Sequence, residues 1–149
     1  MNFTETRGND GQHDARVSFS GALLAPLASF GGIYSPENLP RLPDDFFAQH
    51  LQDDYKQLAL ALLELLEVDV DKAVLQQAVA LYDRFDDPGN PVPLVKLEEN
   101  LFVCELYHGP TRAFKDIALQ PFGVLLSALA QQQKRQYLIL TATSGDTGP

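Results

Sequence analysis

Two short segments of the sequence contain residues whose types and spacing could carry out chemistry, and the first surrounds Lys115. This lysine lies at the start of an apolar segment, close to Phe114 and Ile117. An apolar setting disfavours the ammonium ion, and the neutral amine is the form that attacks a carbonyl or forms a Schiff base. The alternative is a surface lysine that pairs with Asp116 or with water, and for an arbitrary lysine this alternative is the more common one.

The second segment, residues 144–148, has the sequence SGDTG and follows the apolar residues 137–142. After a buried strand, such a loop directs backbone N–H groups and hydroxyls toward the start of the next helix, where they bind a carboxylate or a phosphate. The loop has neither the spacing of a Walker loop nor that of a dinucleotide-binding fingerprint. Because Ser, Gly, Asp and Thr are also common turn residues, an ordinary turn is the alternative.

The other reactive side chains are three histidines and one cysteine. His13, His50 and His108 lie too far apart in the sequence for metal-ligand spacing, so we predict no metal site. His108 precedes Lys115 in the same loop and is the histidine that we assign to the candidate site. Cys104 lies in an apolar strand pattern, which predicts a small buried side chain rather than a nucleophile.

The overall charge excludes two classes of partner. The chain has 149 residues, with 20 Asp and Glu against 11 Lys and Arg, and a net charge of −9. Nucleic acids and anionic membranes both attract basic surfaces, so we expect neither as a partner. The N-terminus lacks the apolar region of a secretory signal, and the most apolar stretch, residues 58–66, is short and contains Glu64. These features favour a cytoplasmic chain.

The elements that must position these residues differ along the chain. Apolar residues at three- and four-residue spacing predict three helices between residues 43 and 85. Acidic residues at helix starts accept hydrogen bonds from free backbone N–H groups. Residues 86–93, DDPGNPVP, break this pattern and end a mainly helical unit, residues 1–93. The helix starts are marked by the acidic pairs at 44–45 and 53–54 and by Asp71.

After this boundary the pattern becomes that of an α/β fold. Residues 94–107 contain two apolar runs around a polar turn and predict a hairpin. An apolar helix follows over about residues 113–133, and Pro121 requires that it start late or kink. Residues 137–142, YLILTA, are typical of a strand in a parallel sheet that is buried on both faces. Residues 94–149 therefore have the order of elements that begins an α/β domain.

The two chemical segments also resemble signatures of one enzyme family. Residues 106–116, LYHGPTRAFKD, resemble the cofactor-lysine segment of threonine synthases. Residues 140–148, LTATSGDTG, resemble the next signature of that family. The opening of the chain is similar as well, with TRG at residues 6–8 and GGIYSP at residues 31–36. The resemblance thus extends over almost the whole chain.

The resemblance implies a fold and a reaction. Threonine synthases share the tryptophan synthase β-like fold of pyridoxal 5′-phosphate enzymes (fold type II), and they convert O-phospho-L-homoserine and water to L-threonine and phosphate. Residues 1–93 would then be the mainly helical N-terminal subdomain, and residues 94–149 would be the start of the catalytic α/β domain. Lys115 would hold the cofactor and move protons between substrate carbons.

The resemblance also implies roles for the loop residues. It makes Ser144, Gly145, Thr147 and Gly148 contacts of the substrate and Asp146 a contact of the cofactor.

Thr111 and His108 match the motif before the lysine and are implied as further substrate contacts. Two residues depart from the family pattern. Arg112 stands where members often carry an apolar residue, and it would either bind the anionic substrate or face solvent; Pro121 is unexpected within a helix.

Family members are much longer than 149 residues. The segments that cradle the cofactor phosphate and contact the pyridine nitrogen lie downstream in them, so we expect the chain by itself to be inactive. Two alternatives remain open at this point. The chain could belong to another pyridoxal-phosphate enzyme that releases phosphate without forming threonine, or it could be a non-catalytic interaction fragment. The sequence also leaves open whether copies of the protein form a homo-oligomer.

Overall fold

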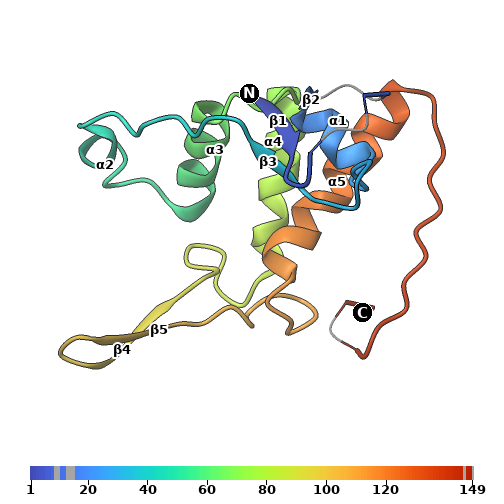
Figure 1. Ribbon diagram of the computed structural model, residues 1–149. Coiled ribbons are helices and arrows are strands. Elements are labelled where there is room, and N and C mark those ends of the chain that lie inside the picture. The colour runs from blue at the N-terminus through green and yellow to red at the C-terminus, as the bar shows by residue number, and fades with distance from the viewer. Residues whose placement is uncertain (9–10, 13–15, 146, 149) are drawn as a thin grey trace.

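The computed structural model describes residues 1–8, 11–12, 16–145 and 147–148. Over these residues the chain forms two antiparallel sheets, five α-helices and one 3₁₀ helix (Figure 1). Helices α4 (Lys72–Val79) and α5 (Asp116–Gln132) lie side by side (Figure 1). The mixture of helices and strands agrees with the general fold class that the sequence predicts.

The first sheet lies at the N-terminus. Its strands are β1 (Asn2–Glu5), β2 (Arg16–Ser18) and β3 (Tyr34–Pro36), with β1 in the middle. Glu5 fixes the turn before β3, because its carboxylate accepts hydrogen bonds from the hydroxyl of Ser29 and the backbone N–H groups of Phe30 and Gly32. The short helix α1 (Phe19–Leu24) follows β2. Nothing in the polar composition of the first residues predicts β1.

The helices of the middle region agree with their predicted positions. They are α2 (Phe46–Gln49), α3 (Tyr55–Leu65) and α4, and the 3₁₀ helix η1 (Ala80–Arg84) continues α4. Asp54 caps α3 by accepting a hydrogen bond of 2.8 Å from the backbone N–H of Gln57. Asp71 caps α4 in the same way, at 2.7 Å from the N–H of Ala73. Each cap satisfies a backbone donor that has no partner within its helix.

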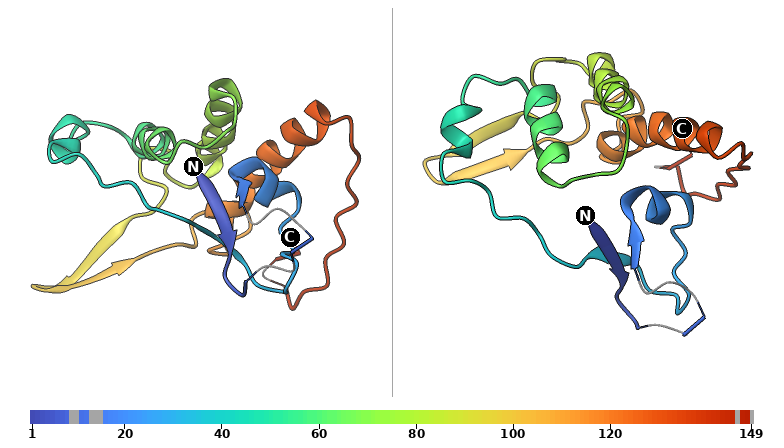
Figure 2. Two further views of the ribbon diagram at one scale, coloured as in Figure 1. Left: turned by 45° about the horizontal axis from the view of Figure 1, so that its top comes forward. Right: turned by 90° about the horizontal axis from the view of Figure 1, so that it is seen from above.

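The hydrophobic core joins the helical region to the helix that follows Lys115. Leu75 and Ala78 of α4 pack against Leu125 of α5. One turn further along, Tyr82 and Phe85 pack with Ile117 at the start of α5. The two views of Figure 2 show the same pairing of α4 with α5. The beginning of α5 therefore rests on a buried surface, which fixes the end of the loop that carries the lysine.

Pro121 lies inside α5, and the structure answers the question that it raises. The helix starts at Asp116, which is not late enough to leave Pro121 outside its interior, and it continues through the proline. Pro121 has no N–H, so it cannot bond the carbonyl of Ile117 one turn back. The hydroxyl of Tyr82 donates a hydrogen bond of 2.7 Å to that carbonyl instead. A side chain from η1 thus replaces the missing backbone bond.

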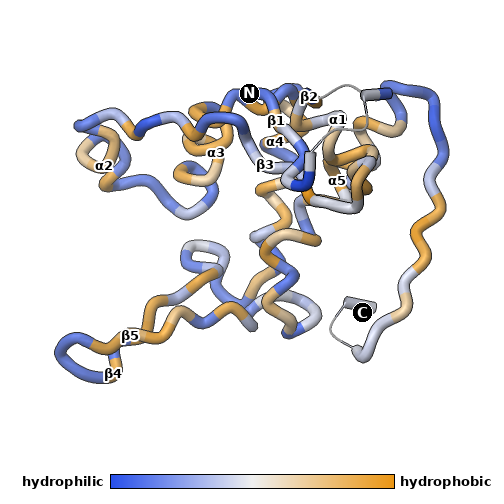
Figure 3. The backbone as a smooth tube through the Cα atoms, viewed as in Figure 1, coloured by the Kyte–Doolittle hydropathy of each residue, from blue (hydrophilic) through white to orange (hydrophobic). Residues whose placement is uncertain are grey.

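The predicted hairpin is confirmed, but its surroundings are not as expected. Strands β4 (Leu94–Glu98) and β5 (Leu101–Cys104) pair antiparallel and project away from the helices (Figures 1 and 2). Every residue of both strands is exposed, although many are apolar (Figure 3). The prediction that Cys104 is buried is therefore wrong, because strand β5 is exposed along its whole length.

The strand predicted at residues 137–142 is wrong for the structure described here. The segment is extended but makes no strand pairing, and Leu138 and Leu140 are 83 % and 84 % exposed. Figure 3 shows its apolar residues on a single trace that runs from the end of α5. A strand requires a neighbour for its backbone donors and acceptors, and the described residues offer this segment none.

Candidate functional site

Lys115 stands at the junction between a loop and α5. The loop comes from the end of β5, and Lys115 is the last residue before the helix. Its amine donates a hydrogen bond of 2.5 Å to the hydroxyl of Thr147, which is 32 residues further along the chain. The amine also lies 5.5 Å from the centre of the Phe114 ring. The two segments that the sequence singles out therefore meet, because the C-terminal segment runs from the end of α5 back toward its beginning (Figure 1).

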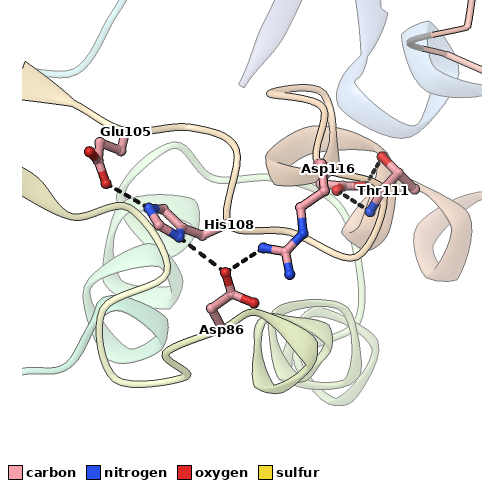
Figure 4. Close-up of polar contacts among 6 residues, drawn as sticks. Asp86, Glu105, His108, Thr111 and Asp116 are labelled. Atoms are coloured by element: carbon pink, nitrogen blue, oxygen red, sulfur yellow. Dashed lines mark hydrogen bonds and ion pairs between the residues drawn. The ribbon is translucent and has the colours of Figure 1, made fainter.

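Asp116 holds the loop before the lysine in place. Its side chain is only 2 % exposed. Its carboxylate accepts hydrogen bonds from the backbone N–H of Thr111 at 2.8 Å and from the hydroxyl of Thr111 at 3.0 Å (Figure 4). It also accepts a hydrogen bond of 3.1 Å from the side-chain amide of Gln120. A buried carboxylate is tolerated only when such donors satisfy it. The loop and the first turn of α5 are thereby tied together around Lys115.

This arrangement restricts the neighbouring residues. A Cβ atom at Gly109 would overlap the side chain of Asp116, so only glycine fits there. The carbonyl of Gly109 accepts a hydrogen bond of 3.1 Å from the N–H of Arg112, which closes the turn. The sequence motif contains Gly109 and Asp116, but spacing alone does not reveal that they are in contact. The hydroxyl of Thr111 is directed to Asp116, and its implied role as a substrate contact stays a prediction.

His108 lies in a network of charged groups on the other side of this loop. Its Nε2 is 2.7 Å from a carboxylate oxygen of Glu105, and its Nδ1 is 3.2 Å from one of Asp86 (Figure 4). Both ring nitrogens can donate at the same time only in the imidazolium form. The hydrogen bonds to Glu105 and then to Asp86 accordingly raise the pKa of His108 above its ordinary value. The role of His108 as a substrate contact also stays a prediction.

Arg112 belongs to the same network. Its guanidinium donates to the Asp86 oxygen that faces His108. The hydrogen bonds from Arg112 and then His108 hold the pKa of the Asp86 carboxyl below its ordinary range. Of the two roles that the sequence leaves open for Arg112, contact with an anionic substrate or with solvent, neither includes this ion pair.

The loop of the second signature is organised by a residue that the sequence analysis did not select. The hydroxyl of Thr143 accepts hydrogen bonds of 3.2 Å from the backbone N–H groups of Gly145 and Thr147. Gly145 has a φ of 130°, which strongly favours glycine. A Cβ atom at Gly148 would lie 2.6 Å from the Thr143 side chain. A hydroxyl just before a glycine-rich turn is the signal that could have identified Thr143.

The predicted substrate contacts of this loop are accessible. Ser144, Gly145, Thr147 and Gly148 are all exposed. Asp146, the predicted cofactor contact, lies outside the described residues.

The residues present fit a cofactor that carries an aldehyde and anionic groups. The primary amine of Lys115 is partly exposed, and the Thr147 hydroxyl lies beside it. The exposed glycine-rich loop adds backbone donors close to that hydroxyl. An amine that can form a Schiff base next to hydrogen-bond donors for an anion matches the two needs of such a cofactor.

Comparison with known proteins identifies the family of the chain. Residues 2–81 match the family described as "Threonine synthase N terminus". The threonine synthase of Pseudomonas aeruginosa is 37 % identical over 99 % of this chain and 31 % of its own length. "Threonine synthase-like 2" of Rattus norvegicus is 35 % identical over 99 % of this chain and 30 % of its own length. The chain thus spans about a third of the length of the curated relatives that it matches.

A solved structure extends the likeness to three dimensions. The crystal structure of threonine synthase from Brucella melitensis with bound pyridoxal phosphate has a TM-score of 0.80 and 32 % identity, covering 90 % of this chain and 28 % of that chain. The fold and the family match point to the same class of enzyme. The chain belongs to the threonine synthase N-terminus family. None of the described helices is long and apolar enough to cross a membrane.

Proposed function

We propose that this chain forms the N-terminal part of a pyridoxal 5′-phosphate-dependent threonine synthase. The reaction converts O-phospho-L-homoserine and water to L-threonine and phosphate. One observation carries the proposal: the amine of Lys115 lies 2.5 Å from the hydroxyl of Thr147, so the two family signatures meet at one place. The match of residues 2–81 to the family supports it independently.

In this proposal Lys115 is the residue that holds the cofactor. When bound, pyridoxal phosphate supplies an electron sink for carbanions that form on the substrate. The amine of Lys115, once released, accepts and returns protons at Nζ. Lys115 directly precedes α5, and the buried Asp116 ties the loop to the first turn of that helix. The backbone that carries the amine is thereby positioned, which general acid–base transfer requires.

The second loop binds the substrate carboxylate in the same proposal. Ser144, Gly145, Thr147 and Gly148 provide hydroxyls and backbone N–H groups, and Asp146 contacts the cofactor. The exposure of the four described residues supports this role, since nothing in the described chain covers them. Loops of this kind bind anions through several weak donors that point to one place.

The division of the chain belongs to the proposal as well. We assign residues 1–93 to the mainly helical subdomain and residues 94–149 to the start of the catalytic domain. The breaker segment at 86–93 supports the division, although α5 packs on α4 across it. A cytoplasmic location and a homo-oligomeric state stay predictions.

The test of the lysine assignment uses the full-length enzyme that contains these residues. Borohydride reduction followed by peptide mapping is expected to find the cofactor attached to Lys115. Lys115→Ala should lose the attachment and the visible absorbance, while the matched control Lys134→Ala, in the turn after α5, should keep both. Attachment to a different lysine would overturn the assignment, and full-length protein without bound cofactor would favour the non-catalytic alternative.

Product analysis separates the two enzyme candidates. We expect full-length enzyme to form one threonine for each phosphate that it releases from O-phospho-L-homoserine. Phosphate release without threonine would instead identify the enzyme as a phospho-lyase. The two products are measured in the same reaction, so the ratio does not depend on how much of the enzyme is active.

A further inference from the structure

We propose that Asp86 is a positioning residue for Lys115, and that it acts by holding His108 and Arg112 in the loop before the lysine. Its effect on catalysis rests on the proposed function above. Its effect on the loop does not, and the two can be measured separately.

Asp86 starts from a fixed point in the molecule. It follows Phe85, which is 4 % exposed and packs in the core with Val79 and Tyr82. Its backbone N–H donates a hydrogen bond of 3.0 Å to the carbonyl of His108. Because Phe85 is anchored in the core, the neighbouring Asp86 can set the position of the loop that contains His108.

The side chain of Asp86 adds two contacts to the same loop. One carboxylate oxygen faces the His108 Nδ1 at 3.2 Å and also accepts a hydrogen bond from the Arg112 guanidinium. His108 and Arg112 lie on either side of the turn that Gly109 closes. Asp86 thus contacts residues at both ends of this turn, which ends three residues before Lys115.

The backbone conformation of Arg112 shows why contacts from outside the loop are needed. Arg112 has a φ of 62°, in the left-handed region that arginine seldom adopts. A residue keeps this conformation only when the surrounding contacts impose it. Asp86 holds the Arg112 side chain from outside the loop, and the bonds from Thr111 to Asp116 hold the following residues from within.

The alternative for Arg112 is direct binding of the substrate phosphate. Its pairing with Asp86 opposes this, because the carboxylate already binds Nη1 of the guanidinium and offsets its positive charge. The two roles predict different kinetics. A positioning residue changes kcat, whereas a group that binds substrate equally well throughout the reaction changes KM.

The first experiment measures amide hydrogen exchange in cofactor-free, full-length protein. Asp86→Asn, which keeps the size of the side chain, and Arg112→Met are each expected to speed exchange across residues 108–112 by about tenfold while α4 keeps its protection. Asp87→Asn is the matched control, because the Asp87 carboxylate bonds only the nearby N–H of Gly89 in the contacts described. Arg112 is 63 % exposed, so its substitution leaves the core intact.

The second experiment measures kinetics in the loaded enzyme. We expect Asp86→Asn and Arg112→Met each to lower kcat about tenfold with little change in KM, because displacement of a reacting group by a fraction of an ångström has this order of effect. The double variant should be no worse than Asp86→Asn alone, since Asp86→Asn already removes the contact that Arg112→Met removes. Arg112→Lys should recover part of the loss.

Each outcome decides between the hypotheses. Exchange and kcat at wild-type values in both variants would overturn the role of Asp86 and leave the proposed function intact. A higher KM at constant kcat in Arg112→Met alone would make Arg112 a substrate ligand. Faster exchange throughout the protein would show a merely structural role and also overturn the proposal. If full-length enzyme makes no threonine, the proposed function fails, and the exchange experiment still tests the contacts of Asp86 with the loop.

Discussion

The loop before Lys115 and the segment after α5 contain the two family signatures, yet the chain holds them in different ways. The lysine loop is fixed by the buried Asp116 from one side and by Asp86 from the other. Residues 136–145 are exposed throughout. Further along this segment, the hydroxyl of Thr147 accepts a hydrogen bond from the amine of Lys115. A recognisable motif therefore does not tell how firmly its residues are positioned.

The difference has a physical cause in the kind of partner that each segment needs. The polar groups of the lysine loop find donors and acceptors in nearby side chains, and the helix after it rests on the core. A strand such as the one predicted at residues 137–142 must pair its backbone with neighbouring strands, which the described residues do not provide. Local contacts therefore suffice to position the lysine loop, but they do not suffice to form a strand at residues 137–142.

The largest expected effect tests whether the second segment becomes a buried strand in the full-length enzyme. Ile139→Asp would then place an unpaired carboxylate between apolar layers, and we expect a loss of about 4 kcal/mol or more in the free energy of unfolding. Urea unfolding measures it, with Gln136→Asp as the control at the preceding polar position. A loss below about 0.5 kcal/mol would show that residues 137–142 stay exposed and would remove the contrast in burial.

The next largest effect tests whether hydrogen bonds to Asp116 hold the loop before Lys115. Asp116→Ala removes the acceptor of three hydrogen bonds and leaves the N–H of Thr111 without its partner. We expect the full-length protein to lose about 3 kcal/mol of unfolding free energy. Asp116→Asn, which keeps one oxygen acceptor, should cost less. Equal losses from the two substitutions would mean that packing, not hydrogen bonding, holds the loop.

The parts of the fold that sequence could predict depend on local signals. The starts of α3 and α4 follow from Asp54 and Asp71, because a cap is a contact between residues only two or three apart. The hairpin follows from two apolar runs around a polar turn. The meeting of Lys115 with the 143–148 loop agrees with two motifs that resemble one family.

The parts that could not be predicted depend on contacts between distant residues. Asp86 and Arg112 are 26 residues apart, and nothing in either sequence context indicates the other. The apolar pattern around Cys104 predicts burial, but a pattern shows which residues could be covered and not what covers them. Strand β1 forms from mostly polar residues because its backbone pairs with two neighbours, and such a short segment gives no clear strand pattern in the sequence.

A smaller effect concerns the way in which α5 tolerates Pro121. Tyr82→Phe removes the hydroxyl that bonds the Ile117 carbonyl, and we expect a loss of about 1 kcal/mol in unfolding free energy. In a Pro121→Ala background the residue at 121 regains an N–H for the same carbonyl, so Tyr82→Phe should then cost less than half as much. An equal loss in both backgrounds would show that the proline and the hydroxyl are independent.

The charge network gives the lysine loop a dependence on pH. Because the pKa of His108 is raised in the fold, its stabilising effect is complete below its ordinary value of 6.5 and is lost as pH rises through the raised value. The pKa values of Asp86 and Glu105 are lowered, so their effect is present above their ordinary values and is lost as pH falls through the lowered ones. The loop should be firmest between these limits.

Proton NMR of the His108 ring measures this directly. We expect a titration midpoint above 6.5 that moves down in Asp86→Asn and does not move in Asp87→Asn. If the His108 midpoint is the same in Asp86→Asn as in the wild type, the raised pKa is due to Glu105 alone. Asp86 would then have no electrostatic effect on the lysine loop.

The smallest expected effect lies in the second loop. Thr143→Val keeps the shape of the side chain and removes the hydroxyl that accepts the N–H groups of Gly145 and Thr147. Because both groups are exposed, water replaces the lost acceptor, and the free energy of unfolding should change by less than about 0.5 kcal/mol. In the same variant of the full-length enzyme, KM for O-phospho-L-homoserine should rise, since the loop N–H groups lose the hydroxyl that orients them. A large loss of stability would show that this loop, like the lysine loop, is held by its own hydrogen bonds, and the contrast between the two segments would then rest on burial alone.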